Sequence, residues 1–432
     1  EVPWEILGEA PEKKGGNHVA ISRRGVLALP ALAALPAVAM AAETVKIGVI
    51  LPLTGNAAGA GQSMKQAIEL AIDVINKPTP ELAPVPLAAG AGLTALGGAR
   101  IEAIFADNQG SPSVGQSQAL RLITQDQVVA LNGAYQSSIT LTTSAVAERY
   151  GIPYVNGTST ASNLTERGYK WFFRTTPIGP DFARLYLDFL AYVAKTGMAT
   201  GKIAVVHENT DYGTSVADSI VKVAADHGVK IALRIAYNAN GTDVSPQVLQ
   251  LKQAAPDVVI FVSYTSDSIL YMKTFHTLDY RPPIVIGDDS GFSDPSFVKT
   301  VGPIAQGALN RSAFVPGKPG TVTYKVNALF RKQTGRDMDD TSARAMQGFL
   351  VLADAINRAG STKPAAIQKA LVETNLPPSE LVIGYKGVKF NAQGQNTLGY
   401  ALLIQLLGKD WVPVWPTSEA TARLVLPFKG WT

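Results

Sequence analysis

The stretch Val45–Leu51 (VKIGVIL) decides the fold, together with the loop Thr54–Gly61 (TGNAAGAG) and the pattern that follows it. The first stretch is short, largely apolar and rich in β-branched residues, which is typical of a strand covered on both faces. After the loop, apolar residues recur at helical spacing, at Met64, Ala67, Ile68, Ala71, Ile72 and Ile75. Strand, small-residue loop and helix predict a β-α unit that opens an α/β fold.

The same alternation continues in two series along the chain. The first series predicts strands at 101–105, 128–131 and 152–155, separated by helical patterns at 117–125 and 140–150. The second series begins after Pro177 and predicts strands at 203–206, 229–233, 258–262 and 284–286. This spacing suits βαβ units with right-handed crossovers. Two successive series therefore predict two lobes, each a doubly wound parallel sheet.

Later patterns predict that the chain passes repeatedly between these lobes. Helical patterns at 323–333 and 343–359 precede strand patterns at 400–407 and 411–414, which we assign to the second lobe. We expect crossings near Pro177, Val315 and Ile383, and hence a three-strand hinge that suits closure around a ligand. The expected domains are lobe 1 at 42–177 and 316–382, and lobe 2 at 178–315 and 383–432. The stretch 78–98, rich in Pro, Ala, Gly and Leu, is expected to be a surface excursion of lobe 1.

Residues 1–41 resemble a signal peptide. Arg23-Arg24 precedes an uncharged, weakly apolar run, and Ala39-Met40-Ala41 forms a small-residue cleavage site. These features are typical of a twin-arginine export signal, here behind an extension at 1–17. The alternative is an uncleaved membrane anchor, although Pro30 and Pro36 interrupt the run. We expect an exported, periplasmic protein that acts as a monomer.

The composition and the absence of certain motifs argue against several classes of function. Cysteine is absent, the four histidines show no metal-ligand spacing, and the net charge of +4 is not gathered into a basic stripe. The dinucleotide fingerprint G-x-G-x-x-G is not met, because Gly59-Ala60-Gly61 is followed by Gln62, Ser63 and Met64, and neither a phosphate loop nor a G-x-S-x-G motif occurs. We therefore expect no metal, no cofactor, no nucleic-acid partner and no enzymatic activity.

Hydroxyl side chains follow two predicted strands of the first lobe. They are Ser137-Ser138 and Thr158-Ser159-Thr160. In open parallel sheets, ligands gather at the carboxyl ends of the strands, where helix N-termini and hydroxyls suit a carboxylate. The alternative is that Ser137 or Ser138 only caps the following helix.

Tyrosines and acids follow strands of the second lobe. Tyr212, Tyr264 and the pair Asp288-Asp289 fall at such positions. A carboxylate that faces a cleft beside tyrosines suits a ligand ammonium, since the ligand would supply the missing charge. The alternatives are a solvated loop or N-cap role for the acids and ordinary core packing for the tyrosines.

Three landmarks in this order resemble the periplasmic branched-chain amino-acid-binding proteins of ABC transporters, which have the type I solute-binding fold. They are the opening Thr44–Val49 with Ala71–Asn76, the segment Gly151-Ile152-Pro153 with Thr158–Thr160, and His207–Gly213. The resemblance implies a binding protein that closes two lobes, like a Venus flytrap, over an amino acid or similar small carboxylate and delivers it to an ABC permease. It assigns Ser137, Thr158 and Thr160 to the ligand carboxylate, and Tyr212, Tyr264 and Asp289, or else Asp288, to the ammonium.

The sequence departs from the family pattern around the expected side-chain pocket. Ala60 stands where branched-chain binders carry an aromatic residue, and Tyr135-Gln136 replaces smaller or apolar residues before Ser137. The pocket is therefore expected to be reshaped, and aromatic acids, amides and urea-like solutes remain open as ligands. Two other functions remain open as well: a ligand sensor that acts on a signalling partner, and an exported α/β enzyme.

Overall fold

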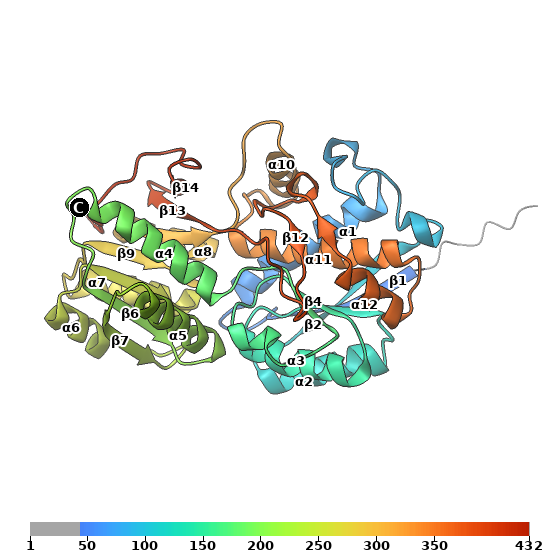
Figure 1. Cartoon of the computed structure of the whole chain (residues 1–432), viewed down its shortest axis with the longest axis horizontal. Coiled ribbons are helices and arrows are strands. Elements are labelled where there is room, and N and C mark those ends of the chain that lie inside the picture. Colours follow the sequence, from blue (N-terminus) through green and yellow to red (C-terminus); the bar gives the residue numbers. More distant parts are fainter. Residues whose placement is uncertain (1–43, 432) are drawn as a thin grey trace, which may run out of the picture. The chain divides into compact units, whose positions relative to one another are not determined.

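Strands form two large sheets in residues 44–431, which are the residues that this computed structural model describes (Figure 1). The expected export signal at 1–41 lies outside the described residues. Each large sheet is parallel in its central part and carries helices on both faces. We call each sheet with the helices packed on it a lobe. The α/β fold with two doubly wound lobes, predicted from the sequence, is thereby confirmed.

The first sheet has the order β2-β1-β3-β4-β5 and is parallel throughout. Strand β1 pairs on both sides, and all its residues except Thr44 and Lys46 are buried, as the apolar run VKIGVIL predicts. Strand β5 was not predicted, because three residues are too short for a visible period. The strands are β1 Thr44–Leu51, β2 Arg100–Asp107, β3 Ala130–Gly133, β4 Tyr154–Asn156 and β5 Phe172–Arg174.

Helices from distant parts of the sequence cover the two faces of this sheet. Helices α1, α10 and α11 share one apolar core with inward residues of β1, while α2 and α3 share another with the opposite face. The helices are α1 Ala58–Asn76, α2 Pro112–Thr124, α3 Ser137–Tyr150, α10 Val322–Thr334, α11 Asp340–Ala359 and α12 Pro364–Val372. The expected return of the chain to lobe 1 after Val315 is consistent with this packing.

The second sheet has the order β14-β13-β10-β9-β8-β6-β7. Strand β13 pairs antiparallel with both of its neighbours, β10 and β14. Strand β10 was not predicted, because its LNRS sequence contains three polar residues that are all buried here. The strands are β6 Ile203–Glu208, β7 Ile231–Tyr237, β8 Val258–Val262, β9 Ile284–Gly287, β10 Leu309–Ser312, β13 Leu402–Leu407 and β14 Asp410–Trp415.

The second sheet is also covered on both faces. Helices α4 and α5 pack on one face, and α6 and α7 pack on the other (Figure 1). The odd-numbered residues of β6 face the first pair and the even-numbered residues face the second, as strand geometry requires. The helices are α4 Gly179–Ala194, α5 Asp211–Asp226, α6 Ser245–Ala254, α7 Thr265–Thr277, α8 Ser290–Ser293 and α9 Pro295–Val301.

The third passage between the lobes lies later than expected. Ile383, Tyr385 and Phe390 belong to the core of lobe 1, and β11 Asn375–Leu376 pairs there with β12 Val388–Lys389. The chain therefore reaches the second sheet only between Phe390 and β13. This passage is hydrogen-bonded to the first one: Arg174 Nε donates to Gln395 Oε1 at 2.6 Å, and Asn396 N donates to the Arg174 carbonyl at 2.8 Å.

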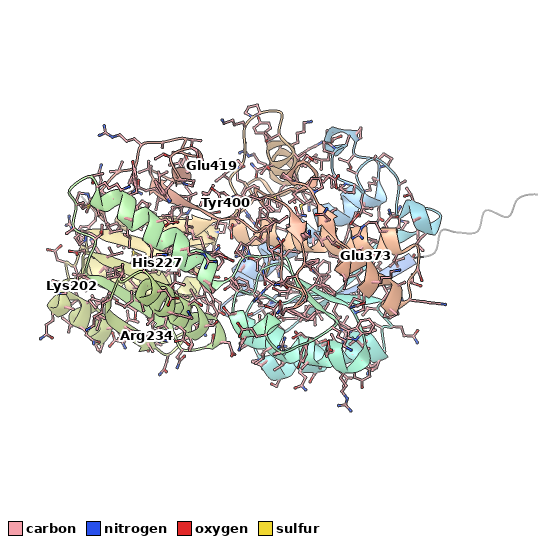
Figure 2. All side chains as sticks on the ribbon, in the orientation of Figure 1. Lys202, His227, Arg234, Glu373, Tyr400 and Glu419 are labelled. Atoms are coloured by element: carbon pink, nitrogen blue, oxygen red, sulfur yellow. The ribbon has the colours of Figure 1, made fainter. Side chains whose placement is uncertain are left out.

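The stretch 78–98 is not a free excursion. Its apolar residues are buried in the core of lobe 1, and two short 3-10 turns, η1 Pro80–Leu82 and η2 Thr94–Leu96, interrupt it. The buried residues are Leu82, Val85, Leu87, Ala88 and Leu93. Elsewhere, exposed side chains of both charge signs include Lys202, Arg234, Glu373 and Glu419 (Figure 2). Arg234 Nη1, for example, lies 2.7 Å from Asp218 Oδ1.

Helix α11 approaches the loop after β4 at backbone distance. A Cβ atom at Gly157 would lie 2.4 Å from the carbonyl oxygen of Arg344, and one at Gly348 would lie 3.0 Å from Cα of Gly157. Both residues must therefore lack a side chain for α11 to lie where it does. This contact fixes Arg344 next to the hydroxyl cluster that follows β4.

We predict that Gly157→Ala destabilises the protein by about 1–3 kcal/mol, because the added methyl group would force α11 away from β4. Gly201→Ala is the matched control, since a Cβ at Gly201 meets no atom within 4 Å. Its free energy of unfolding should change by less than about 0.5 kcal/mol. Urea unfolding followed by circular dichroism measures both, and equal stabilities of the two variants would contradict this account of the α11 contact.

Candidate functional site

Loops at the carboxyl ends of strands from both lobes enclose a cavity of about 300 Å³. Lobe 1 contributes the loops after β1, β2 and β3, and lobe 2 contributes those after β6, β7 and β8. The lining is polar but carries no charged side chain among the described residues. The lining residues are Gly55, Asn56, Ala57, Gln109, Gly110, Gln136, Ser138, Thr210, Ala239, Asn240 and Tyr264.

Two lining residues present buried polar atoms without a partner. The hydroxyl of Tyr264 and Oε1 of Gln136 are both inaccessible to solvent and hydrogen-bond to no other group. Beside this wall lie Tyr135, whose ring centroid is 5.8 Å from that of Tyr264, and Thr160, and their hydroxyls are also buried and unpartnered. Buried polar groups are nearly always hydrogen-bonded, so unpartnered atoms from both lobes indicate a site that a polar ligand completes.

The first-lobe hydroxyls predicted from the sequence differ in whether they already have a hydrogen-bond partner. Ser137 is the first residue of α3, and its Oγ accepts from Ala161 N at 3.3 Å; the described contacts give it no capping bond. Thr158 Oγ1 donates to the Ala134 carbonyl at 3.1 Å. Thr160 Oγ1 is the member of this set that has no partner. All three are buried next to the N-terminus of α3, which helps to balance negative charge.

The second-lobe tyrosines also differ. Tyr264 contributes to the cavity wall, whereas Tyr212 lies behind it, 5.3 Å away between ring centroids and 3% exposed. The hydroxyl of Tyr212 donates to Asp288 Oδ2 at 2.9 Å. Burial raises the pKa of both phenols well above the ordinary tyrosine value, so each stays a neutral hydrogen-bond donor.

Asp289 is fully buried and is already paired with a cation of the protein. Its Oδ2 contacts Nη2 of Arg344 and lies 3.4 Å from Nη2 of Arg311, while Oδ1 accepts from Ser293 Oγ at 2.6 Å. The backbone of Asp289 has φ of +61°, an uncommon value for a non-glycine residue. Asp289 N donates to Asn310 Oδ1 at 2.9 Å, and this bond helps to hold that turn.

Asp289 belongs to what we call the buried charge network, namely Asp288, Asp289, Arg311, Asp340 and Arg344. Arg344 Nε lies 2.6 Å from Asp340 Oδ2, and Arg311 Nε lies 3.1 Å from Asp288 Oδ1. Arg344 and Asp340 come from α11 of lobe 1, whereas the other three come from loops and strands of lobe 2. The network therefore connects the lobes through ions that are at most 4% exposed as residues.

Mutual pairing sets the protonation behaviour of this network. Burial raises the pKa of the Asp289 carboxyl, and the Arg344 guanidinium counteracts that rise. Burial acts the same way on Asp340, but there the guanidiniums of Arg344 and Arg311 prevail and lower the pKa of that carboxyl. The two carboxylates in turn raise the pKa of Arg344 despite its burial.

The segment His207–Gly213 has a structural explanation. Glu208 ends β6, and its carboxylate accepts from Thr210 Oγ1 at 2.8 Å and from Gly213 N at 2.5 Å at the start of α5. A Cβ at Gly213 would lie 2.1 Å from the carbonyl oxygen of Glu208. The segment thus fixes the N-terminus of α5 and places Tyr212 behind the cavity.

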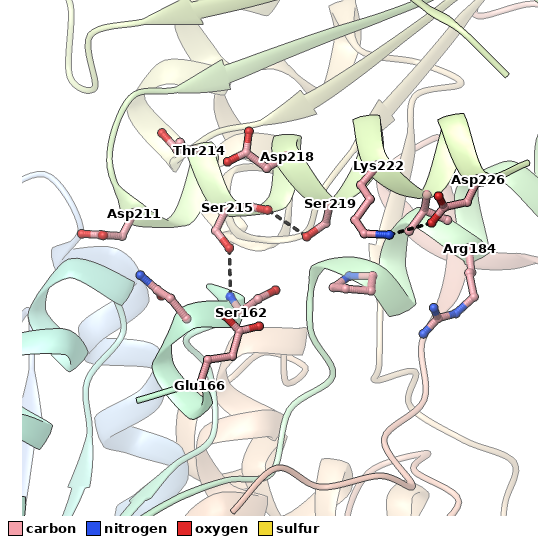
Figure 3. Close-up of a pocket in the computed structure, with 13 residues that line it drawn as sticks. Ser162, Glu166, Arg184, Asp211, Thr214, Ser215, Asp218, Ser219, Lys222 and Asp226 are labelled. Carbon is pink, nitrogen blue, oxygen red and sulfur yellow. Dashed lines mark hydrogen bonds and ion pairs between the residues drawn. The ribbon is translucent and has the colours of Figure 1, made fainter. Parts of the chain in front are cut away.

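A second hollow, a groove of about 580 Å³, lies where η3 Ser162–Thr165 of lobe 1 meets α5 (Figure 3). Ser162 N donates to Ser215 Oγ at 2.9 Å across this groove, so the lobes touch here directly. Its lining carries four acids and two bases, and Lys222 Nζ pairs with Asp226 Oδ2 at 2.8 Å. It contains none of the residues predicted for ligand binding.

Within residues 44–431, no group of three or more His, Cys, Asp or Glu side chains is arranged to hold a metal ion. A search of the same residues finds no helix with the length and apolar character that crossing a bilayer requires.

Sequence reasoning missed Arg344 and Arg311 as parts of this region, whereas Tyr135 was expected to reshape the pocket. The signal for Arg344 is an arginine inside α11, where every residue from Asp340 to Ile356 is buried. A charged side chain in such a helix requires a partner, but the sequence does not indicate which carboxylate supplies it.

Known proteins share this architecture. A sequence profile of the periplasmic binding protein family matches residues 44–403. Leu/Ile/Val-binding protein homolog 7 of Brucella suis is 28% identical over 418 residues, which cover 93% of this chain and 99% of that protein. The resemblance stated from the three landmarks is confirmed by these matches.

Solved structures support the fold. The branched-chain amino-acid substrate-binding protein of Streptococcus pneumoniae in complex with isoleucine superimposes with a TM-score of 0.72 at 19% identity and covers 89% of this chain and 100% of that one. A solute-binding protein of an ABC transporter from Rhodopseudomonas palustris, in complex with 3,4-dihydroxybenzoic acid, gives a TM-score of 0.71 at 19% identity, covering 86% and 96%. With the profile match over most of its length, the chain belongs to the family of periplasmic binding proteins and has their type I fold.

Proposed function

We propose that this protein captures a small carboxylate-bearing solute between its lobes, outside the cytoplasmic membrane, and delivers it to an ABC permease. The observation that carries the proposal is the cavity at the strand ends, with the unpartnered hydroxyl of Tyr264 and amide oxygen of Gln136 in its wall. Binding without chemistry is sufficient for this role, and the Leu/Ile/Val-binding relative supports it.

The first-lobe wall suits the carboxylate of the solute. Helix α3 has 14 residues, and its N-terminus reaches the cavity through Gln136 and Ser138. Free backbone N–H groups there favour an anion, and the Thr160 hydroxyl can donate to it beside Ser137 and Thr158. Each charge-assisted hydrogen bond of this kind contributes about 1.5–3 kcal/mol, or roughly 10- to 150-fold in affinity.

The second-lobe wall is proposed to hold the rest of the solute. Tyr264 lines the cavity and its phenol is neutral, while Tyr212 packs against its ring and donates to Asp288. Since both lobes contribute to the wall, a solute that contacts both is bound more tightly by the closed form. Closure then follows from that difference in affinity.

Export to the periplasm and action as a monomer complete the proposal. The twin-arginine pattern of residues 23–24 and the membership of the periplasmic binding protein family support export. The export route is tested by expressing the full chain with Arg23-Arg24 replaced by Lys-Lys, which should retain the unprocessed protein in the cytoplasm.

We predict that Tyr264→Phe weakens binding of the tightest acid in a thermal-shift panel by about tenfold, because one donor to the solute is lost. Tyr280→Phe is the matched control: its hydroxyl is also buried and unpartnered, but it lies in the core between α7 and the second sheet. Titration calorimetry should give wild-type affinity for this control. Equal affinities for all three proteins would place the solute elsewhere.

Delivery is tested separately from binding. Right-side-out vesicles of the cytoplasmic membrane from the cells that produce this protein should take up the labelled acid only when the loaded binding protein is added outside. Tyr264→Phe should lower uptake at limiting acid concentration, in proportion to its lost affinity. Uptake that does not depend on the added protein would remove permease delivery from the proposal and favour a sensing role.

A further inference from the structure

We infer that the solute carries no ammonium group, so that this protein selects carboxylic acids over the corresponding α-amino acids. This inference rests on the proposed function and specifies its substrate class. It departs from the sequence-based expectation that Asp289 receives a ligand ammonium. Its basis is that the protein itself supplies the cation at Asp289, through Arg344.

The carboxylate of Asp289 has little capacity left for a ligand. Oδ2 is shared by the guanidiniums of Arg344 and Arg311, and Oδ1 accepts from Ser293 Oγ. The side chain is at most 1% exposed and is not part of the cavity lining. An ammonium could reach this carboxylate only by displacing a guanidinium.

Arg344 is not free to leave. Its Nη1 donates to the Thr158 carbonyl at 2.8 Å and to Thr176 Oγ1 at 3.1 Å, and its Nε pairs with Asp340 at 2.6 Å. The backbone contact between α11 and Gly157 holds the helix that carries it. Displacing the guanidinium from Asp289 would therefore leave Nη2 of Arg344 buried without an acceptor, while the rest of that side chain stays fixed by its other partners.

No other acid replaces Asp289 at the cavity. Asp288, the alternative predicted from the sequence, already accepts from Tyr212 and pairs with Arg311, and it does not line the cavity. Two further buried acids belong to residues beside the lining: Glu208, whose carboxylate is occupied by Thr210 and Gly213, and Asp267, which accepts from Asn240 N at 2.9 Å. Neither contributes to the cavity lining, and burial raises the pKa of both carboxyls. An ammonium in the cavity would meet only amide, hydroxyl and carbonyl oxygens.

The cavity offers good partners for the opposite charge. Tyr264, Gln136 and Ser138 of α3 line it. The Tyr264 hydroxyl, the Nε2 amide of Gln136 and the free N–H groups at the start of α3 can donate to an anionic oxygen, whereas the unpartnered Oε1 of Gln136 can only accept. A carboxylate therefore gains hydrogen bonds on entry, whereas an ammonium loses its hydration without gaining a counter-ion.

The test compares solutes that differ only in their charged groups. L-leucine carries both groups, 4-methylpentanoate keeps only the carboxylate, and 4-methylpentanamide has neither charge. L-phenylalanine, 3-phenylpropanoate and 3-phenylpropanamide form a second series with a larger side chain. Calorimetry on the wild-type protein should give at least tenfold tighter binding of the carboxylate than of the amino acid in the series that fits the cavity.

The outcomes separate this inference from the proposed function. If the amino acid binds more tightly than its carboxylate counterpart, the inference is overturned and the proposed function stands. If the amide binds most tightly, the absence of an ammonium stands but the carboxylate part of the proposed function fails. If no member of either series binds, the proposed function itself is overturned for solutes of this size, and the inference with it.

A pair of variants then identifies the residue responsible. Arg344→Met removes the closer of the two cations from Asp289 and leaves Arg311 Nη2 at 3.4 Å, so a ligand cation can compete for this carboxylate and the ratio of amino-acid to carboxylate affinity should rise at least tenfold. Arg358→Met, on the same helix and paired with Asp354 at 2.7 Å, is the matched control and should leave the ratio unchanged. An unchanged ratio in folded Arg344→Met would overturn the role of Arg344; the wild-type series decides the substrate class even if that variant does not fold.

Discussion

The ion pair between Arg344 and Asp289 is the contact on which the interior of this protein depends. It joins α11 of lobe 1 to the loop after β9 of lobe 2, with Asp340 and Arg311 as the next members on either side. Buried ions are costly unless they are fully paired, so this arrangement is permitted only when both lobes present their charges at the correct positions. The positive-φ turn at Asp289 and the close contact between Gly157 and α11 both hold these charges at their positions.

The hinge is built around the same network. Asp340 Oδ1 accepts from Ser312 Oγ at 3.1 Å and from Phe314 N at 3.1 Å, so the second passage between the lobes is tied to the first turn of α11. The first and third passages are tied to each other through Arg174, Gln395 and Asn396. The three passages are thus held in place by buried polar groups.

The sequence predicted the fold well where a pattern repeats. β1 and β8 are strongly apolar runs, and their bounds agree with the structure to within a residue. Strand β10 has the sequence LNRS and was missed because three of its residues are polar. These side chains are buried with partners from other parts of the sequence; Arg311, for example, pairs with Asp288. The third passage was placed too early because Ile383 and Phe390 are apolar, and the apolar character of a residue does not indicate in which of the two lobes it packs.

Of the six residues predicted to bind the ligand, Tyr264 lines the cavity at the strand ends, whereas the pairing of Asp289 with Arg344 was not predictable from the sequence. The carboxyl ends of the strands indicate where hydroxyls and tyrosines gather, and Tyr264 and Thr160 carry unpartnered hydroxyls there. Which cation faces Asp289 depends on how α11 returns to lobe 1, a contact between residues 55 positions apart. The spacing of residue types along the sequence does not indicate which distant residues, such as Arg344 and Asp289, form a pair.

The uncharged lining of the cavity has a consequence for the surroundings in which the protein works. Screening by dissolved salt weakens interactions between exposed charges, whereas sealed ion pairs and short hydrogen bonds are affected much less. The proposed contacts with a solute in this cavity, made by amides, hydroxyls and backbone groups, should therefore depend little on ionic strength, whereas exposed ion pairs such as Arg234–Asp218 should weaken as the salt concentration rises.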